Sequence, residues 1–464
     1  MSPTKKIEVR YEHGLLLPEI DFWLDPPRAK ERAFVSHAHA DHYARHRTIV
    51  CSQPTRALIE KRYGRPKHAT FVALEYGEPY TLTDDVVLEL FPAGHVLGSA
   101  QCHLKRLSDG ASLLYSGDFK LRRSAAAEAI EIPKAQTLIM ETTFSTPQYR
   151  FPPREQIIGD VLRFCRHTLE QGQTPILLAY SLGKAQEILA LLRESQLPMM
   201  LHPTVAEMTE VYRTYLDVFP AYAILGKGKV NGHVVIAPPT TARSQDLRRL
   251  GSTRLAMLSG WAAQRDASYR FGAHAVFPLS DHADYADSLR YVEQVEPELV
   301  YTLHGYAADF AADLRQRGRP AWSVIDDNQL ALGLTLTDAE RASVPETQSD
   351  EVVAFKNASN TIEALRQVEK SLLRALGSCQ MRSPELISYF QGLEPEDLRR
   401  ALCWLTGNFP ATPAEPLKRL RSRRALATQL AQALTGWSTA QFRKKLFTPI
   451  IRFSSLVLAL GPGY

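Results

Sequence analysis

Short runs of apolar residues alternate with longer stretches of helical length through most of the chain. The runs occupy positions 33–35, 86–91, 113–115, 138–140, 176–179 and 234–236. Each is short enough to be a strand, and segments containing Gly, Pro and Asp separate them. Positions 154–170 and 184–193 lie between such runs and have the length of helices. The pattern predicts an α/β fold whose sheets are buried by helices.

The pattern changes near the C-terminal end. Residues 336–360 are polar and have no sustained period, which predicts a linker. Beyond them, apolar residues recur every three or four positions, at Ile362, Leu365, Val368, Leu372 and Leu376. Gly407 and Gly436 follow similar stretches and are typical of helix ends. We predict a small all-helical domain over residues 361–464.

Composition narrows the class of protein. A chain of 464 residues exceeds what one hydrophobic core usually serves, so two or three domains are expected. With 45% hydrophobic and 23% charged residues it is typical of a soluble globular protein. No apolar run approaches the ~20 residues of a membrane helix, and residues 1–13 lack the apolar core of a signal peptide. The five cysteines form no C-x-x-C pair, which excludes a disulfide framework and fits a cytoplasmic location.

Charge and histidine are unevenly distributed. The net charge is +5, but residues 361–464 hold 15 Lys and Arg against 7 Asp and Glu. All 14 histidines lie between His13 and His304. The chain is therefore a histidine-rich body followed by a basic segment, and the two need separate explanations.

Residues 36–42 read S-H-A-H-A-D-H and are the most informative stretch. After the apolar run at 33–35, an extended backbone would project His37, His39 and Asp41 to one side. His42 would then point elsewhere, unless the backbone turns. Imidazole and carboxylate groups at this density suit Zn²⁺ or a similar divalent ion. A polar loop that happens to be rich in histidine is the alternative.

Further motifs follow in a fixed order: Gly94-His95, Ser116-Gly117-Asp118, Glu141-Thr142-Thr143-Phe144, Leu279-Ser280-Asp281-His282 and Leu303-His304-Gly305. This series resembles the metallo-β-lactamase superfamily and, within it, the β-CASP nucleases that act on DNA or RNA. The segments 180–184 and 259–261 resemble those of Artemis-type DNA end-processing nucleases. The body also resembles bacterial exonucleases found beside ATP-dependent DNA ligases. The resemblance implies an αββα sandwich formed by residues 1–145 and 271–335, with a β-CASP α/β domain inserted at 146–270.

The resemblance implies two divalent metal ions, with Zn²⁺ expected ahead of Mn²⁺. The residues implied as ligands are His37, His39 and His95 for one ion, Asp41, His42 and His304 for the other, and Asp118 as a bridge. Two such ions would neutralise charge on the phosphorus oxygens and lower the pKa of water, as phosphodiester hydrolysis requires.

Three other residues have implied roles around these ions. His282 would be the general acid that protonates the leaving oxygen, and Glu141 would orient it. Asp21 would accept a ring N–H from one ligand histidine and so fix its tautomer. Asp25 competes for that role, and Asp21 is favoured.

Residues 180–184 (Tyr-Ser-Leu-Gly-Lys) end an apolar run and open a predicted helix. Backbone N–H groups and Lys184 could hold a terminal phosphate there, with Tyr180, Ser181 and Gly183. An ordinary strand-to-helix turn is the alternative, and the P-loop pattern is absent. Trp261 could line a substrate channel or belong to the core.

The basic segment has a resemblance of its own. Residues 398–424 resemble part of the N-terminal helical, DNA-binding domain of ATP-dependent DNA ligases, although no K-x-D-G adenylation motif occurs in the chain. Five cations fall within seven residues: Lys418, Arg419, Arg421, Arg423 and Arg424. Such a cluster predicts salt-sensitive phosphate binding, with a solvated basic face as the alternative.

These observations predict a metal-dependent nuclease that trims DNA ends in repair, beside an ATP-dependent DNA ligase and away from membranes. His304 keeps a second reading open, because Artemis-type enzymes usually have valine there and RNA-processing members have histidine. A ribonuclease of the same group is therefore the alternative. A non-catalytic scaffold is disfavoured because every expected ligand type is present, and a small-molecule hydrolase would have no use for the long insertion or the basic segment.

Overall fold

A computed structural model describes residues 6–324, apart from 13, 227–229, 243, 245–246, 248–249 and 265–266. These residues belong to one unit, Met1–Thr335. The predicted linker (336–360) and helical domain (361–464) lie outside the described residues. So do the five predicted phosphate-binding cations Lys418, Arg419, Arg421, Arg423 and Arg424.

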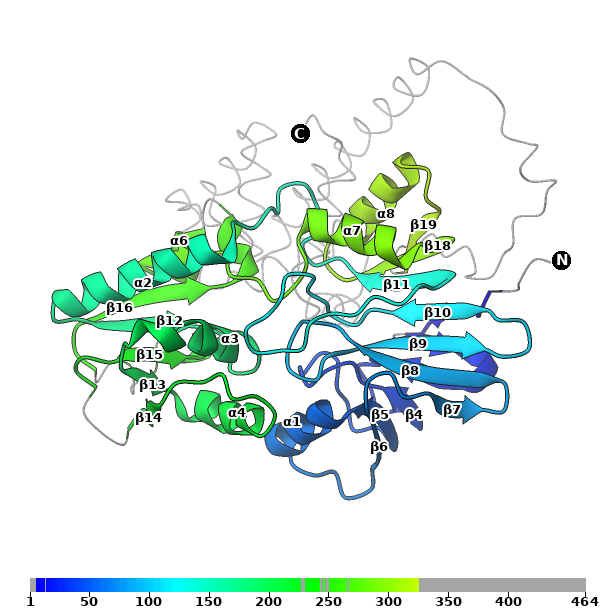
Figure 1. Ribbon diagram of the computed structural model, residues 1–464, viewed down its shortest axis with the longest axis horizontal. Helices are drawn as coiled ribbons and strands as arrows, with labels where there is room; N and C mark the ends of the chain where they lie inside the picture. Colours follow the sequence, from blue (N-terminus) through cyan, green and yellow to red (C-terminus); the bar gives the residue numbers. More distant parts are fainter. Residues whose placement is uncertain are drawn as a thin grey trace, which may run out of the picture. The chain divides into compact units, whose positions relative to one another are not determined.

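The described part of the chain is a mixed α/β protein with three sheets, as the sequence predicts (Figure 1). The first sheet contains β1 (Arg10–Tyr11), β2 (Leu15–Leu17), β3 (Phe22–Leu24), β4 (Arg32–Phe34), β5 (Thr48–Ser52) and β6 (Thr70–Leu74), in that order. The strands from β3 to β6 are parallel, whereas β1, β2 and β3 pair antiparallel.

The second sheet is mixed and gathers strands from both ends of the described chain. Its order is β19 (Ala321–Ser323), β18 (Leu299–Leu303), β11 (Thr137–Glu141), β10 (Ser112–Tyr115), β9 (Ala100–Arg106), β8 (Val86–Pro92) and β7 (Tyr80–Thr83). The strands from β19 to β10 pair in parallel, and those from β10 to β7 pair antiparallel.

The first two sheets pack face to face between helices. Their shared core includes Leu17, Phe34 and Val50 from the first sheet and Leu88, Leu104 and Leu113 from the second. Helices α7 (Tyr285–Val295) and α8 (Ala307–Gln316) bury Val292, Phe310 and Leu314 on the outer face of the second sheet. Helix α1 (Gln53–Tyr63) packs Leu58 and Ile59 against β5. The layers therefore run helix, sheet, sheet, helix (Figure 1).

The third sheet is entirely parallel and lies beside this four-layer body (Figure 1). Its order is β14 (Tyr222–Ile224), β13 (Met199–Leu201), β15 (Val234–Ala237), β12 (Thr174–Leu178), β16 (Thr253–Leu258) and β17 (Ala275–Phe277). Its helices are α2 (Arg154–Glu170), α3 (Lys184–Leu191), α4 (Pro203–Arg213) and α6 (Ala267–Phe271). Short 3-10 helices occur at Pro18–Ile20, Arg193–Ser195, Pro239–Thr241 and Gly260–Ala263.

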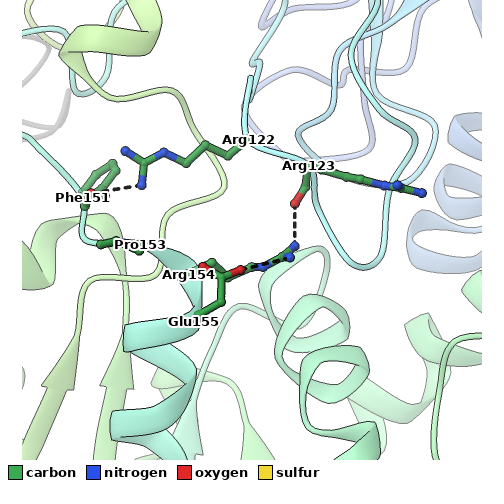
Figure 2. Close-up of a pocket in the computed structure, with 6 residues that line it drawn as sticks. All are labelled: Arg122, Arg123, Phe151, Pro153, Arg154 and Glu155. Atoms are coloured by element: carbon green, nitrogen blue, oxygen red, sulfur yellow. Dashed lines mark hydrogen bonds and ion pairs between the residues drawn. The ribbon is translucent and has the colours of Figure 1, made fainter.

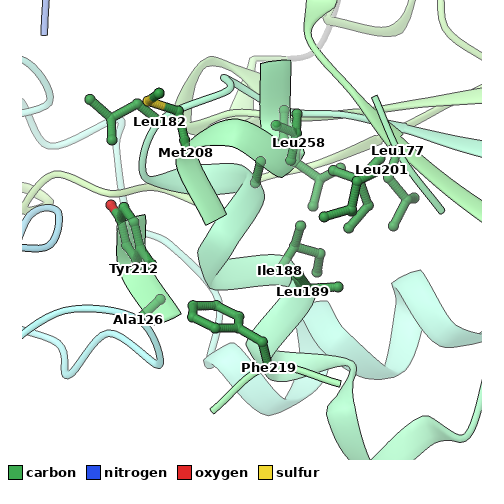
Figure 3. Packing of buried hydrophobic residues seen from close by; sticks show 14 of the residues in the cluster. Ala126, Leu177, Leu182, Ile188, Leu189, Leu201, Met208, Tyr212, Phe219 and Leu258 are labelled. Carbon is green, nitrogen blue, oxygen red and sulfur yellow. The ribbon is translucent and has the colours of Figure 1, made fainter. Parts of the chain in front are cut away.

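Helices α3 and α4 cover one face of the third sheet. Figure 3 shows Leu177, Leu201 and Leu258 of the sheet on the side of Ile188 of α3, and Tyr212 of α4 at the other side of the same cluster. The Tyr212 hydroxyl also accepts the backbone N–H of Leu97 across 3.3 Å, which ties this sheet to a loop of the four-layer body.

The predicted elements agree closely with the structure. Each predicted strand coincides with a strand to within two residues, and the helix predicted at 154–170 is α2. The helix predicted at 184–193 ends at Leu191 and continues as a 3-10 turn. The boundaries at 145, 270 and 335 stay a prediction. No helix within residues 6–324 is long and apolar enough to cross a membrane.

Candidate metal centre

The histidine-rich loop begins where β4 ends, at Phe34. It is not extended, because the backbone turns and the His42 N–H donates to the His39 carbonyl across 3.3 Å. The predicted alternation is therefore wrong for Asp41, whose side chain is 82% exposed. His42 is turned inward in its place and is buried.

Four donor groups converge beneath this loop: His37, His39, His95 and Asp118, each with one ligand atom within 4.8 Å of the others. The His37 Nε2 and His95 Nε2 atoms lie 2.9 and 3.3 Å from the His39 Nδ1 atom. The same two Nε2 atoms lie 3.7 and 3.8 Å from Asp118 Oδ2. Sequence positions 37, 39, 95 and 118 thus meet at one point.

The spacing of these atoms fits a divalent metal ion. Ligands about 2.0–2.2 Å from a tetrahedral Zn²⁺ lie about 3.3–3.6 Å from one another, close to the observed separations. Burial lowers the pKa of His37 well below its usual value, and burial with the His282 ring lowers the pKa of His95 to about 4. Both rings are then neutral, as ligands must be. Although burial opposes ionisation of Asp118, His42 and its neighbours hold the pKa of this carboxyl well below its usual range.

The other nitrogen of each ring is held by a protein oxygen. His37 Nδ1 lies 3.0 Å from the Ser36 hydroxyl, His95 Nδ1 lies 2.8 Å from the Asp281 carbonyl, and His39 Nε2 lies 3.1 Å from the Leu182 carbonyl. These contacts fix which nitrogen of each ring points at Asp118. Two of the oxygens come from segments far along the chain.

Asp25, and not Asp21, orients a histidine of this loop. The Asp25 carboxylate accepts His42 Nδ1–H across 2.8 Å, the Ser36 N–H across 2.7 Å and the Tyr115 hydroxyl across 2.9 Å. The choice of Asp21 is therefore wrong, because Asp21 is exposed at the end of a 3-10 turn. Asp25 directly follows β3 (Phe22–Leu24), which carries it into the core beside β4.

The second predicted set of ligands is more open than the first. His42 Nε2 lies 3.4 Å from Asp118 Oδ2 and 3.9 Å from Asp41 Oδ2. The His304 ring lies next to His42, with 5.7 Å between ring centres. Burial lowers the pKa of His304 below its usual value. Asp41, His42, His304 and Asp118 are neighbours. Among the described residues, however, only the first predicted set brings three histidines and Asp118 together as a close group of four donor atoms.

Parallel pairing of β11 with β18 brings His304 to the site. Glu141 at the end of β11 lies opposite Leu303, and Thr142 holds the His304 carbonyl across 2.6 Å. His304 and the following Gly305 both have positive φ. A Cβ on Gly305 would lie 2.4 Å from the Thr143 Cα, so only glycine fits this turn.

His282 and Glu141 form an ion pair next to Asp118 and the three histidines of the first predicted set. His282 Nδ1 lies 2.8 Å from Glu141 Oε1 and 4.0 Å from Asp118 Oδ2. Burial by itself would lower the pKa of His282, but the charge of Glu141 and its hydrogen bond outweigh this and raise the pKa to about 9. The ring is therefore protonated at neutral pH, with Nε2 available to donate.

Lys184 is not placed to hold a phosphate. Its side chain is 2% exposed, and its ammonium group forms a salt bridge with Asp281 across 2.5 Å and donates to the Leu279 carbonyl. The Gly183 N–H is likewise taken by the Gln186 side chain across 2.8 Å. The predicted role is thus wrong for these two residues, because a charge this deeply buried needs a partner within the protein. Tyr180, 53% exposed, and the half-buried Ser181 remain accessible.

The Lys184–Asp281 pair is a feature that sequence reasoning missed. Asp281 gives its backbone carbonyl to His95 and its side chain to Lys184, so α3 of the third sheet buttresses a ligand of the four-layer body. A second buried pair, Lys120–Glu187 at 2.6 Å, joins the same helix to the loop after Asp118. The sequence offered one signal that Asp281 belongs to the site, because Asp281 directly precedes His282.

Trp261 lies in an aromatic cluster and is half-buried there. Its ring is 4.8 Å from Phe144, and Phe144 is 5.9 Å from His282, between ring centres. Tyr149 and Phe151 complete this cluster. Trp261 thus serves as a packing residue behind the histidine.

A small cavity of about 360 Å³ lies near the start of α2 (Figure 2). Arg122 donates to the Phe151 carbonyl and forms a 2.6 Å salt bridge with Asp284, while Arg154 donates to the Arg123 carbonyl. Two of the three arginines that line it are thus engaged in holding the polypeptide together.

Parts of this chain are similar in sequence to known proteins, although no protein-family model matches it. A protein named a probable DNA ligase, from Opitutus terrae, is 42% identical over 428 residues, which cover 87% of this chain and 40% of that protein. A protein named transcription termination factor FttA, from Methanothermobacter thermautotrophicus, is 30% identical over 206 residues, which cover 38% of this chain and 32% of that protein. An RNase J-like protein from Methanocaldococcus jannaschii is 27% identical over 229 residues, which cover 43% of this chain and 53% of that protein.

The names of these three relatives refer to DNA ligation, to transcription termination and to RNase J. The chain spans less than two thirds of each of the three relatives. The donor groups described above have the composition and spacing of a divalent-metal site.

Proposed function

We propose that this chain is a metal-dependent nuclease that hydrolyses the phosphodiester backbone of DNA and trims DNA ends. The observation that carries the proposal is the convergence of His37, His39, His95 and Asp118, with the His282–Glu141 pair beside them. A scaffold protein has no need of neutral imidazoles and an ionised carboxylate packed at ligand spacing.

The predicted metal ligands and the His282–Glu141 pair have different roles in the proposed reaction. Two divalent ions, held by His37, His39, His95 and Asp118 and by Asp41, His42 and His304, would supply Lewis-acid stabilisation of the phosphoryl oxygens. Water adds to phosphorus and loses one proton to solvent, and the bond from phosphorus to the leaving sugar oxygen breaks. His282 would donate its Nε2 proton to that oxygen, while Glu141 keeps the ring charged and in place. Tyr180 and Ser181 remain candidates for contact with the strand.

A link to ligation has its own support. The relative named a probable DNA ligase contains, within 40% of its length, a region similar to 87% of this chain. The occurrence of such a region in a protein named a DNA ligase favours DNA as the substrate and an ATP-dependent DNA ligase as the partner. The basic residues 418–424 would add phosphate contacts.

RNA is the second candidate substrate. The RNase J-like relative and the histidine at position 304 favour it. The nuclease part of the proposal is common to both substrates.

The experiment compares the full chain on matched DNA and RNA strands labelled at either end, with Mn²⁺ or Zn²⁺. Product ladders on DNA but not RNA, from one labelled end only, are the expected result, and the reverse preference would favour RNA. Asp118→Asn should abolish cleavage, whereas His167→Ala, an exposed histidine on α2, should retain it. Equal cleavage by Asp118→Asn and the wild type would refute the proposal.

A further inference from the structure

A basic groove of about 1160 Å³ lies outside the candidate metal centre. Three loops line it, residues 29–31 before β4, 45–47 before β5 and 64–69 before β6, together with Tyr63 at the end of α1. The charged side chains along it are five cations, Lys30, Arg45, Arg47, Arg65 and Lys67, and one carboxylate, Glu31. Like charges repel, so this concentration in a concave surface favours an anionic ligand.

The three loops are fixed to one another by backbone hydrogen bonds. Arg47 N–H donates to the Lys30 carbonyl across 3.0 Å, and Thr70 N–H donates to the Arg47 carbonyl across 2.7 Å. The buried His46 ring accepts the Lys30 N–H at Nδ1 across 3.2 Å. Burial lowers the pKa of His46 to about 4, so the ring is neutral and can accept. The groove is therefore formed before any ligand binds.

Three of the cations have no ion-pair partner within residues 6–324, and one of these, Lys30, is engaged with the Trp23 ring at 3.2 Å. Arg47 pairs with Glu31 at 3.5 Å and Arg65 with Glu60 at 3.8 Å, both on exposed side chains. Arg45 and Lys67 are exposed and form no such pair in that part of the chain. They are the groups most free to bind an external anion.

The groove shares a wall with the histidine-rich loop. Tyr63 lines the groove, and its hydroxyl donates to the Ala38 carbonyl across 3.3 Å. Ala38 stands between His37 and His39, and Arg45 follows His42 by three residues. Tyr63 also stacks on Tyr43, with 4.8 Å between ring centres. The groove therefore lies next to the loop that carries the predicted metal ligands.

We propose that this groove binds the sugar–phosphate backbone of a nucleic-acid strand beyond the nucleotides that are cleaved. The inference rests on the proposed nuclease function for its choice of anion. The contacts are charge to phosphate, so binding should depend on strand length and on salt but not on base sequence.

The test measures binding and cleavage separately in the full chain. Binding of fluorescent single strands of about 8 and about 30 nucleotides, in DNA and in RNA form, is measured in the Asp118→Asn background over a range of salt. The groove variant is Arg45→Gln/Lys67→Gln. The matched control is Lys105→Gln/Arg166→Gln, which removes two exposed cations that do not line the groove.

Loss of two phosphate contacts should weaken binding of the long strand on the order of 25-fold at 0.1 M salt and reduce the salt slope by about 1.4. The short strand and the control variant should change by less than about threefold. The DNA and RNA arms show which polymer the groove holds. Wild-type affinity and slope in the groove variant would overturn the inference and leave the cations for another anionic partner.

Cleavage then separates this inference from the proposed function. In the Asp118-containing protein, the groove variant should raise KM for the long strand and leave turnover of the short strand unchanged. If the wild type cleaves neither strand, the proposed function fails, yet the binding measurements still decide whether the groove holds nucleic acid.

Discussion

The His42 ring donates from Nδ1 to the Asp25 carboxylate across 2.8 Å, while its Nε2 lies 3.4 Å from Asp118. One imidazole thus joins a buried carboxylate at the end of β3 to a carboxylate after β10. Asp25 also holds Ser36 and Tyr115, so it organises the loop and the sheet behind it.

Replacing Asp25 with Asn should lower metal affinity about 10–100-fold, because the side chain keeps one accepting oxygen where it now uses two and loses the charge that holds the His42 ring. Metal content measured after dialysis against a graded chelator series checks this. Asp21→Asn, the matched control, alters an exposed carboxylate four residues away and should bind metal like the wild type. Equal losses in both variants would show that Asp25 has no special role.

Glu141→Gln should move the alkaline limb of the pH–rate profile to lower pH. Glu141 raises the pKa of His282 to about 9, so the protonated ring is present below that pH and is lost as pH rises through it. Without the carboxylate the pKa falls, and the general acid is lost earlier. Single-turnover cleavage rates between pH 6 and pH 10 measure the shift. An unchanged alkaline limb would mean that His282 does not supply the proton.

Lys184→Met should destabilise the protein by about 3–5 kcal/mol, because it leaves the Asp281 carboxylate buried and unpaired. The double variant Lys184→Met/Asp281→Asn should recover much of that loss, since it removes the stranded charge. Denaturant unfolding of both variants tests this. A lysine that bound substrate would instead raise KM and leave the free energy of unfolding unchanged.

Gly305→Ala should destabilise the turn that carries His304 by about 1–3 kcal/mol more than Gly272→Ala. Both glycines have a positive φ, near 53° and 59°, so both substitutions carry the same backbone penalty of about 1–2 kcal/mol. Only at Gly305 would the new Cβ lie 2.4 Å from another backbone atom, whereas the space at Gly272 is open. Thermal unfolding of the two variants gives the difference.

The sequence by itself determined the local elements and the chemistry of the site. Apolar runs such as 138–140 are strands because their residues are buried on both sides, and the periodic segment 154–170 is a helix. The density of imidazole and carboxylate groups at 37–42 indicated a metal, because few other uses of such groups require that spacing. These properties depend on residues near one another in the chain.

Only the tertiary structure decided which side chains meet. Asp25, and not Asp21, orients His42 because β3 ends one residue before Asp25 and places it in the core. Asp21 stays at the surface. Asp41 is exposed and His42 is buried because the backbone turns after His39, and the alternation of side chains along an extended strand does not predict such a turn. Lys184 forms a salt bridge with Asp281 because the parallel third sheet and a distant loop bring these two residues, 97 positions apart, into one buried space. Distance along the chain carries no information about such encounters, which depend on how the sheets pack.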